Sequence, residues 1–109
     1  MTHPHRSTTN RERFHHFRIV SPRFTHATVF AREEVPLSNE WRFSVAFCSE
    51  KDRFNRTIGR SIARRKYFNK NRPDPVNDSA TFKLACGDEV YDTAIQWLRT
   101  RFPEIDEVQ

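Results

Sequence analysis

One stretch of the chain decides the fold: residues 41–48, which read Trp-Arg-Phe-Ser-Val-Ala-Phe-Cys. From Trp41 to Phe47 every second residue is large and apolar, which is the period of a β-strand with one face in the core. The other face changes from polar at Arg42 to apolar at Cys48. This change predicts a strand near the middle of a sheet, with a helix covering its second face.

The segments on either side of this strand complete a small domain. The β-branched and aromatic residues upstream predict two strands that pair as antiparallel hairpins. Downstream, the pattern predicts a helix, a fourth strand and a second helix that Asp88 caps. The expected strands cover residues 14–20, 27–33, 41–48 and 81–86, and the expected helices cover residues 50–67 and 88–102. We therefore expect an α+β fold in the order β-β-β-α-β-α, with a mixed four-stranded sheet and two packed helices.

The domain boundaries follow from composition. Residues 1–12 contain Thr, His, Arg and Pro without an apolar period, which predicts a disordered basic arm. Residues 13–103 form the single α+β domain, and residues 104–109 form an acidic tail. Aromatic and basic residues also alternate between Arg11 and Phe24. We interpret those aromatic side chains as the edge of the core, although exposed ones would stack on bases.

The first helix carries the strongest local signal. A capping box at Ser49 and Asp52 predicts where it begins. On a helical wheel, Phe54, Ile58 and Ile62 form one stripe, which we expect to be buried. A different sector collects four guanidinium groups, those of Arg53, Arg56, Arg60 and Arg64. Gly59 in mid-helix predicts a close approach of either a strand or a phosphate backbone, and close packing is the commoner reason.

This concentration of Arg exceeds what solubility requires, because like charges four residues apart weaken a helix. The chain carries a formal net charge of +5, and Arg presents a planar fork of donors that matches phosphate. We therefore expect sequence-independent contact with the backbone of a nucleic acid, DNA or RNA. The expected ligands are Lys51, Arg53, Arg56, Arg60, Arg64, Lys66 and Lys70. The alternatives are docking on an acidic host protein and a solvated face neutralised by Glu33, Glu34, Glu40 or the acidic tail.

The segment from Cys48 to Arg65 resembles a segment of short uncharacterised proteins of phages, plasmids and archaeal viruses. Their pattern is Cys-Ser-x-Lys-Asp-x-Phe-x-Arg-x-x-Gly-Arg-x-Ile-Ala. The matching positions here are Cys48, Ser49, Lys51, Asp52, Phe54, Arg56, Gly59, Arg60, Ile62 and Ala63. The resemblance covers less than a quarter of the chain. It implies an origin in a mobile element and carries no activity with it.

Other kinds of site find little support in the sequence. The two cysteines and five histidines lack the spacing of a zinc site, and no catalytic set of residues is visible, so we expect no metal, no cofactor and no enzyme. The polar start of the chain and the absence of a long apolar run predict a cytoplasmic protein outside the membrane, with reduced thiols. A disulfide between Cys48 and Cys86 and the oligomeric state are left open.

Overall fold

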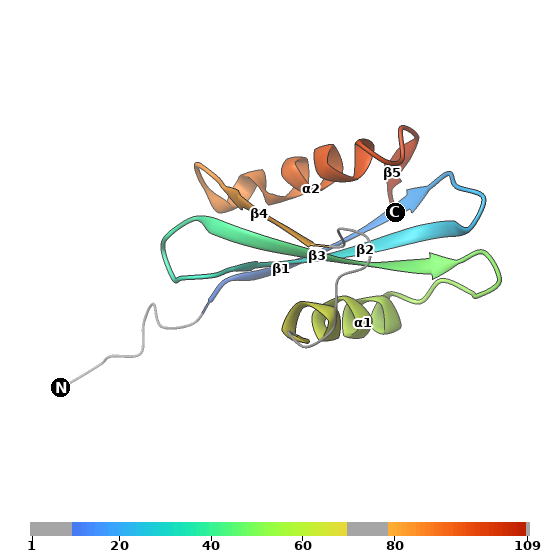
Figure 1. Cartoon of the computed structure of the whole chain (residues 1–109), viewed down its shortest axis with the longest axis horizontal. Helices are drawn as coiled ribbons and strands as arrows, with labels where there is room; N and C mark the ends of the chain where they lie inside the picture. The colour runs from blue at the N-terminus through green and yellow to red at the C-terminus, as the bar shows by residue number, and fades with distance from the viewer. Residues whose placement is uncertain (1–9, 70–78, 109) are drawn as a thin grey trace.

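The computed structural model describes residues 10–69 and 79–108. Within these residues, five strands form one sheet, with the spatial order β4-β3-β2-β1-β5. The strands are β1 (Glu12–Ile19), β2 (Phe24–Glu33), β3 (Glu40–Ser49), β4 (Ser79–Lys83) and β5 (Ile105–Glu107). The helices are α1 (Arg56–Phe68), a 3-10 turn η1 (Gly87–Glu89) and α2 (Val90–Arg99). Helix α1 and helix α2 lie on opposite sides of the sheet, which makes three layers (Figure 1).

The α+β class is as expected, but the mixed four-stranded sheet is wrong. Every pair of neighbouring strands is antiparallel. Strand β4 does lie next to β3, yet it runs the other way, from Ser79 opposite Ser44 to Lys83 opposite Glu40. The expected acidic tail contains β5, where Ile105 pairs with Ile19 and is buried. Residues of the expected arm are also ordered, because Glu12 begins β1; residues 1–9 lie outside the described part of the chain.

The face of the sheet under α2 holds the larger core. Alternate residues of the three longest strands, among them Trp41, Phe43 and Val45, are fully buried on this face. Helix α2 packs Val90, Ala94 and Leu98 against them. Burial of these side chains supplies most of the hydrophobic stabilisation of the domain. The expected cap at Asp88 is wrong: Asp88 lies in the 3-10 turn, Glu89 is the N-cap residue of α2, and the helix ends at Arg99.

The face under α1 holds a smaller core of Phe30, Ala46, Ala63 and Tyr67. The expectation that a helix covers the second face of β3 is confirmed. Beside Phe30, the strands contribute the short side chains of Ser44 and Ala46 on this face, and Ser44 donates a hydrogen bond from its hydroxyl to the Ala63 carbonyl at 3.1 Å. Short side chains allow the helix to lie close to the sheet.

The start of α1 differs from the expected capping box. Asn55 is the N-cap residue, and its side-chain oxygen accepts a hydrogen bond from the Ile58 amide at 3.1 Å. Ser49 instead closes a turn, in which its carbonyl accepts from the Asp52 amide at 3.0 Å. Asn is among the strongest N-cap residues, so the helix begins at Arg56 and residues 50–55 form a connecting segment.

Candidate functional site

Helix α1 presents a different face to the sheet than the wheel predicted. Gly59, Ala63 and Tyr67, spaced four apart, face the sheet, whereas Ile58 is 57% exposed. The expected buried stripe of Phe54, Ile58 and Ile62 is therefore wrong: Phe54 precedes the helix, and both Phe54 and Ile62 are only partly buried. Gly59 and Ala63, the two smallest residues of the helix, let α1 pack close to the sheet.

With this face of α1 toward the sheet, three guanidinium groups lie along one edge of the helix. Arg56, Arg60 and Arg64 are all exposed and follow each other at intervals of four residues; we call them the basic row. The row lies on the side of β1 and β2, since the Arg60 guanidinium sits 6.0 Å from the ring centre of Phe14 and that of Arg64 sits 5.5 Å from the ring centre of Phe30. The guanidinium groups of Arg60 and Arg64 therefore lie within the range of cation–π contacts with these aromatic rings.

A carboxylate from β1 reaches the end of the basic row. Arg64 donates to Glu12 at 2.7 Å, and the other oxygen of Glu12 lies 3.3 Å from Arg32. The single negative charge of Glu12 is thus shared by two guanidinium groups, so it neutralises them only in part. Glu33, one of the expected neutralising residues, is buried on the other side of the strand and is engaged by Arg11 at 3.0 Å.

The remaining expected ligands are distributed differently. Lys51 and Arg53 are exposed in the segment that precedes the helix. Lys66 turns toward the sheet, where its ammonium donates to the Val45 carbonyl at 3.2 Å. Lys70 lies outside the described residues. The structure therefore brings Arg56, Arg60 and Arg64 together, and Lys66 points away from them.

Two histidines next to the row were not recognised in the sequence. His16 on β1 shares a 2.9 Å hydrogen bond with the Thr28 hydroxyl, and the His26 ring stacks on the Phe54 ring at 4.1 Å. Burial lowers the pKa of His16 to about 4, and the charges of Arg56 and Arg60 contribute to this lowering. The alternation of side chains along a strand places Phe14 and His16 on the same face of β1, and this alternation was the signal in the sequence for the position of His16.

The positive potential of the basic row is therefore felt by a neighbouring side chain. With its pKa lowered to about 4, His16 is neutral at pH 7. The pKa of His26 is also lowered, by burial and then by Arg18. A neutral His16 beside a row of cations keeps additional positive charge off this surface. An anion bound at the row would oppose the effect of the Arg charges on His16.

Metal and thiol chemistry receive no support from the described part of the chain. In residues 10–69 and 79–108, no three His, Cys, Asp or Glu side chains are placed to hold a metal ion. Cys48 and Cys86 are both free thiols. The same residues contain no helix that is long and apolar enough to cross a membrane. Comparison with known proteins finds no family model that matches the chain, and no curated protein or solved structure that is similar to it.

Proposed function

We propose that this protein binds nucleic acid by contacting the phosphate backbone with the basic row of α1, without reading the base sequence. The observation that carries the proposal is the alignment of Arg56, Arg60 and Arg64 on one exposed helix edge. Successive members of the row are about 6 Å apart along the helix axis. At this interval the forks of Arg56 and Arg60 can each meet a different phosphate, and Arg64 can meet a third when its contact with Glu12 opens.

The electrostatic state of the neighbouring residues supports the same proposal. The positive charges of Arg56 and Arg60 are strong enough at His16 to lower its pKa in addition to the effect of burial. Such a potential attracts polyanions over distances set by the ionic strength. Affinity should then fall steeply with salt and vary little with sequence.

Docking on an acidic protein is the second candidate function. The observation in its favour is apolar surface beside the row: Ile58 is 57% exposed and Phe68 is 44% exposed. Exposed apolar residues next to charge are common in protein interfaces. Binding to unrelated DNA and RNA separates the two candidates. A protein that docks on one acidic partner would not bind these nucleic acids at physiological salt.

The cellular setting is part of the same proposal. We place the protein in the cytoplasm, where the free thiols of Cys48 and Cys86 stay reduced and nucleic acid is accessible. The resemblance of residues 48–65 to proteins of phages and plasmids supports an origin in a mobile element.

The test is fluorescence anisotropy with a labelled random duplex and a labelled random single strand across a salt series. The comparison is between the natural chain and an Arg56→Ala, Arg60→Ala variant. Removing one phosphate ligand lowers the slope of log affinity against log salt by about one, so the slope of the double variant should be lower by about two. An Arg13→Ala, Arg99→Ala variant removes the same charge from exposed positions away from α1 and serves as the control. If the two variants bind equally well, the basic row is not the binding site.

A further inference from the structure

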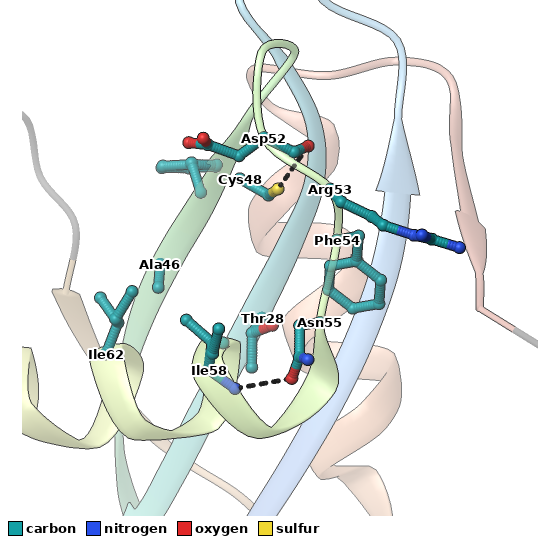
Figure 2. A pocket seen from close by; sticks show the side chains of 11 residues that line it. Thr28, Ala46, Cys48, Asp52, Arg53, Phe54, Asn55, Ile58 and Ile62 are labelled. Carbon is teal, nitrogen blue, oxygen red and sulfur yellow. Dashed lines mark hydrogen bonds between the residues drawn. The ribbon is translucent and has the colours of Figure 1, made fainter.

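A pocket of about 290 Å³ lies between the start of α1, the end of β3 and the segment that joins them. Figure 2 shows Ile58 and Ile62 on the helix facing Ala46 and Cys48 on the strand. Ligand pockets in proteins span roughly 300–1,000 Å³, so this pocket is just below the lower end of the range. It has room for a single ring system.

The walls of the pocket suit a flat ring. Ile58, Ile62 and Ala46 provide aliphatic surface, and Phe54 provides an aromatic ring. The Phe54 ring is held in place by His26, which stacks on it with an angle of 6° between the ring planes. Ile58 lines the pocket while its side chain is largely exposed. A planar apolar occupant would cover the exposed part of Ile58.

A few polar groups lie among these apolar walls. Asp52 brings a carboxylate, and Asn55 brings an amide whose oxygen accepts from the Ile58 amide, so the amide nitrogen is a donor. The Cys48 thiol donates to the Asp52 carbonyl at 3.6 Å. A ring with both donors and acceptors on its edge would be complementary to the carboxylate and the amide. Nucleobases have such edges.

Away from the Asp52 carboxylate, at the end of the pocket formed by the start of α1, the surroundings favour a negatively charged substituent on that ring (Figure 2). The first turn of α1 contains no acidic residue, so the positive end of the helix dipole is not offset there. Arg53 is part of the lining, and its guanidinium extends away from the pocket in Figure 2. Arg56, the first member of the basic row, follows the N-cap Asn55 directly. A nucleotide combines a ring of this kind with a phosphate.

We propose that this pocket receives one unstacked base of a single-stranded nucleic acid whose phosphates lie along the basic row. The inference rests on the proposed function and narrows its substrate class. A duplex is disfavoured because its bases are paired and stacked, and extruding one of them costs energy. A free nucleotide is disfavoured because its phosphate meets one end of a row that extends over two helical turns.

The first experiment uses Cys48 as a reporter of occupancy. In a Cys86→Ser protein, the rate of Cys48 alkylation by N-ethylmaleimide is measured with and without a short oligodeoxythymidine. We expect the oligonucleotide to slow the reaction several-fold, because Cys48 lines the pocket. A Cys48→Ser protein reports on the exposed Cys86, whose rate should stay the same. An unchanged rate at Cys48 under conditions where the strand is bound would overturn the proposal.

The second experiment compares strands that differ only in their bases. The natural chain should bind an oligodeoxythymidine at least about tenfold more tightly than an abasic strand of equal length, given the usual contribution of base contacts. An Ile58→Ser variant should reduce this ratio toward one. A Val35→Ser variant should keep it, since Val35 is 58% exposed in the β2–β3 hairpin and does not line the pocket.

The outcomes separate this inference from the proposed function. Equal affinity of the natural chain for the two strands would overturn the base pocket and leave backbone binding intact. An Arg56→Ala, Arg60→Ala variant should lower both affinities and keep their ratio. If thymidine monophosphate bound as tightly as the oligonucleotide, the occupant of the pocket would be a free nucleotide. The proposal of a single-stranded nucleic acid would then be overturned. Failure of every single strand to bind would overturn this inference, and failure of the random duplex as well would overturn the proposed function.

Discussion

Gly59 of α1 lies directly against Thr28 of β2, so that a β-carbon added to the glycine would overlap the threonine hydroxyl. The Thr28 side chain cannot easily move away, because it is 1% exposed and its hydroxyl is hydrogen-bonded to His16 at 2.9 Å. A branched β-carbon also restricts its rotamers. Of the two reasons considered for a glycine in mid-helix, close packing against a strand is the one the structure shows. This contact fixes the position on the sheet of α1, the helix that carries the basic row.

Gly59→Ala is expected to destabilise the protein, although alanine favours helix by about 1 kcal/mol over glycine. The added methyl group forces α1 away from the sheet, and overpacking of this kind typically costs about 1–3 kcal/mol. Chemical denaturation followed by circular dichroism measures the change in the free energy of unfolding. Ser61→Ala, at an exposed position of the same helix, should be neutral or slightly stabilising. In a Thr28→Ala background the Gly59→Ala change should cost less, and an equal cost in both backgrounds would rule out this contact as the cause.

Glu12→Gln is expected to strengthen binding of nucleic acid. The carboxylate that Arg64 and Arg32 share is removed, which releases the Arg64 guanidinium for a phosphate. The slope of log affinity against log salt should then increase by about one. Stability should change by less than about 1 kcal/mol, as is usual for exposed ion pairs. Anisotropy over a salt series measures affinity and slope together.

The control for this change is Glu104→Gln, which removes the same charge from an exposed residue just before β5. If both substitutions strengthen binding equally, net charge governs the affinity and the position of Glu12 beside the row is irrelevant.

The strands with a regular period were visible in the sequence, and the rest of the sheet was not. The alternation from Trp41 to Phe47 located β3 and its buried face. Strand β5 has three residues and a single buried apolar side chain, Ile105, so no period exists to detect. Its place is decided by packing beside Ile19 of a strand far away in sequence. Strand direction also depends on such long-range pairing, so the mixed sheet was expected although β4 pairs antiparallel with β3.

The candidate site could be predicted in part for a similar reason. Spacing alone groups Arg56, Arg60 and Arg64 on one side of any helix. The face of the helix that packs on the sheet depends on how closely the helix can approach the strands. A helical wheel predicts that Ile58 is buried because it is apolar. Close packing instead places the smaller residue, Gly59, against the sheet. The pocket beside Ile58 follows from that choice, so it could not be expected before the structure.

Glu33→Gln is expected to lower stability at neutral pH by roughly 2–3 kcal/mol, as for hydrogen bonds to a charged group. Glu33 is 1% exposed and accepts hydrogen bonds from Arg11 at 3.0 Å and from the Asn39 amide at 2.7 Å. The hydrogen bonds from Arg11 lower its pKa to about 2. The stabilisation is present above the ordinary pKa of a glutamate and is lost as the pH falls toward 2. Urea denaturation between pH 7 and pH 2 should therefore show a steeper decline in the natural chain than in the variant, and the difference should develop between the ordinary pKa of a glutamate and pH 2.

A matched substitution on an exposed carboxylate, Glu89→Gln in the 3-10 turn before α2, tests whether this loss is specific. Its acid dependence should follow that of the natural chain. A Glu33→Gln variant with the same acid dependence as the natural chain would show that this carboxyl does not titrate with a lowered pKa.

His16 provides a spectroscopic report on the basic row. Nuclear magnetic resonance should find that it titrates near pH 4, because burial, with contributions from Arg56 and Arg60, lowers its pKa to about 4. An Arg56→Ala, Arg60→Ala variant should raise the pKa of His16 but leave it below its ordinary value of 6.5, since burial is the larger cause. Between pH 6.5 and 4 the unfolded chain binds a proton at His16 that the folded chain does not. This group therefore makes the free energy of unfolding fall as the pH decreases through that window.

His15 is the matched control for this titration. Its neighbour in the sequence is His16, but its ring packs on Tyr91 at the opposite face of the sheet. Burial also lowers the pKa of His15, with smaller effects from Glu107 and Arg13. The double Arg variant should therefore shift His16 and leave His15 nearly unchanged, and saturation with a single strand should raise the pKa of His16 alone. Equal shifts at the two histidines would mean that the row acts through the total charge of the protein. No shift at His16 in the variant would show that the basic row does not set the potential at this face of the sheet.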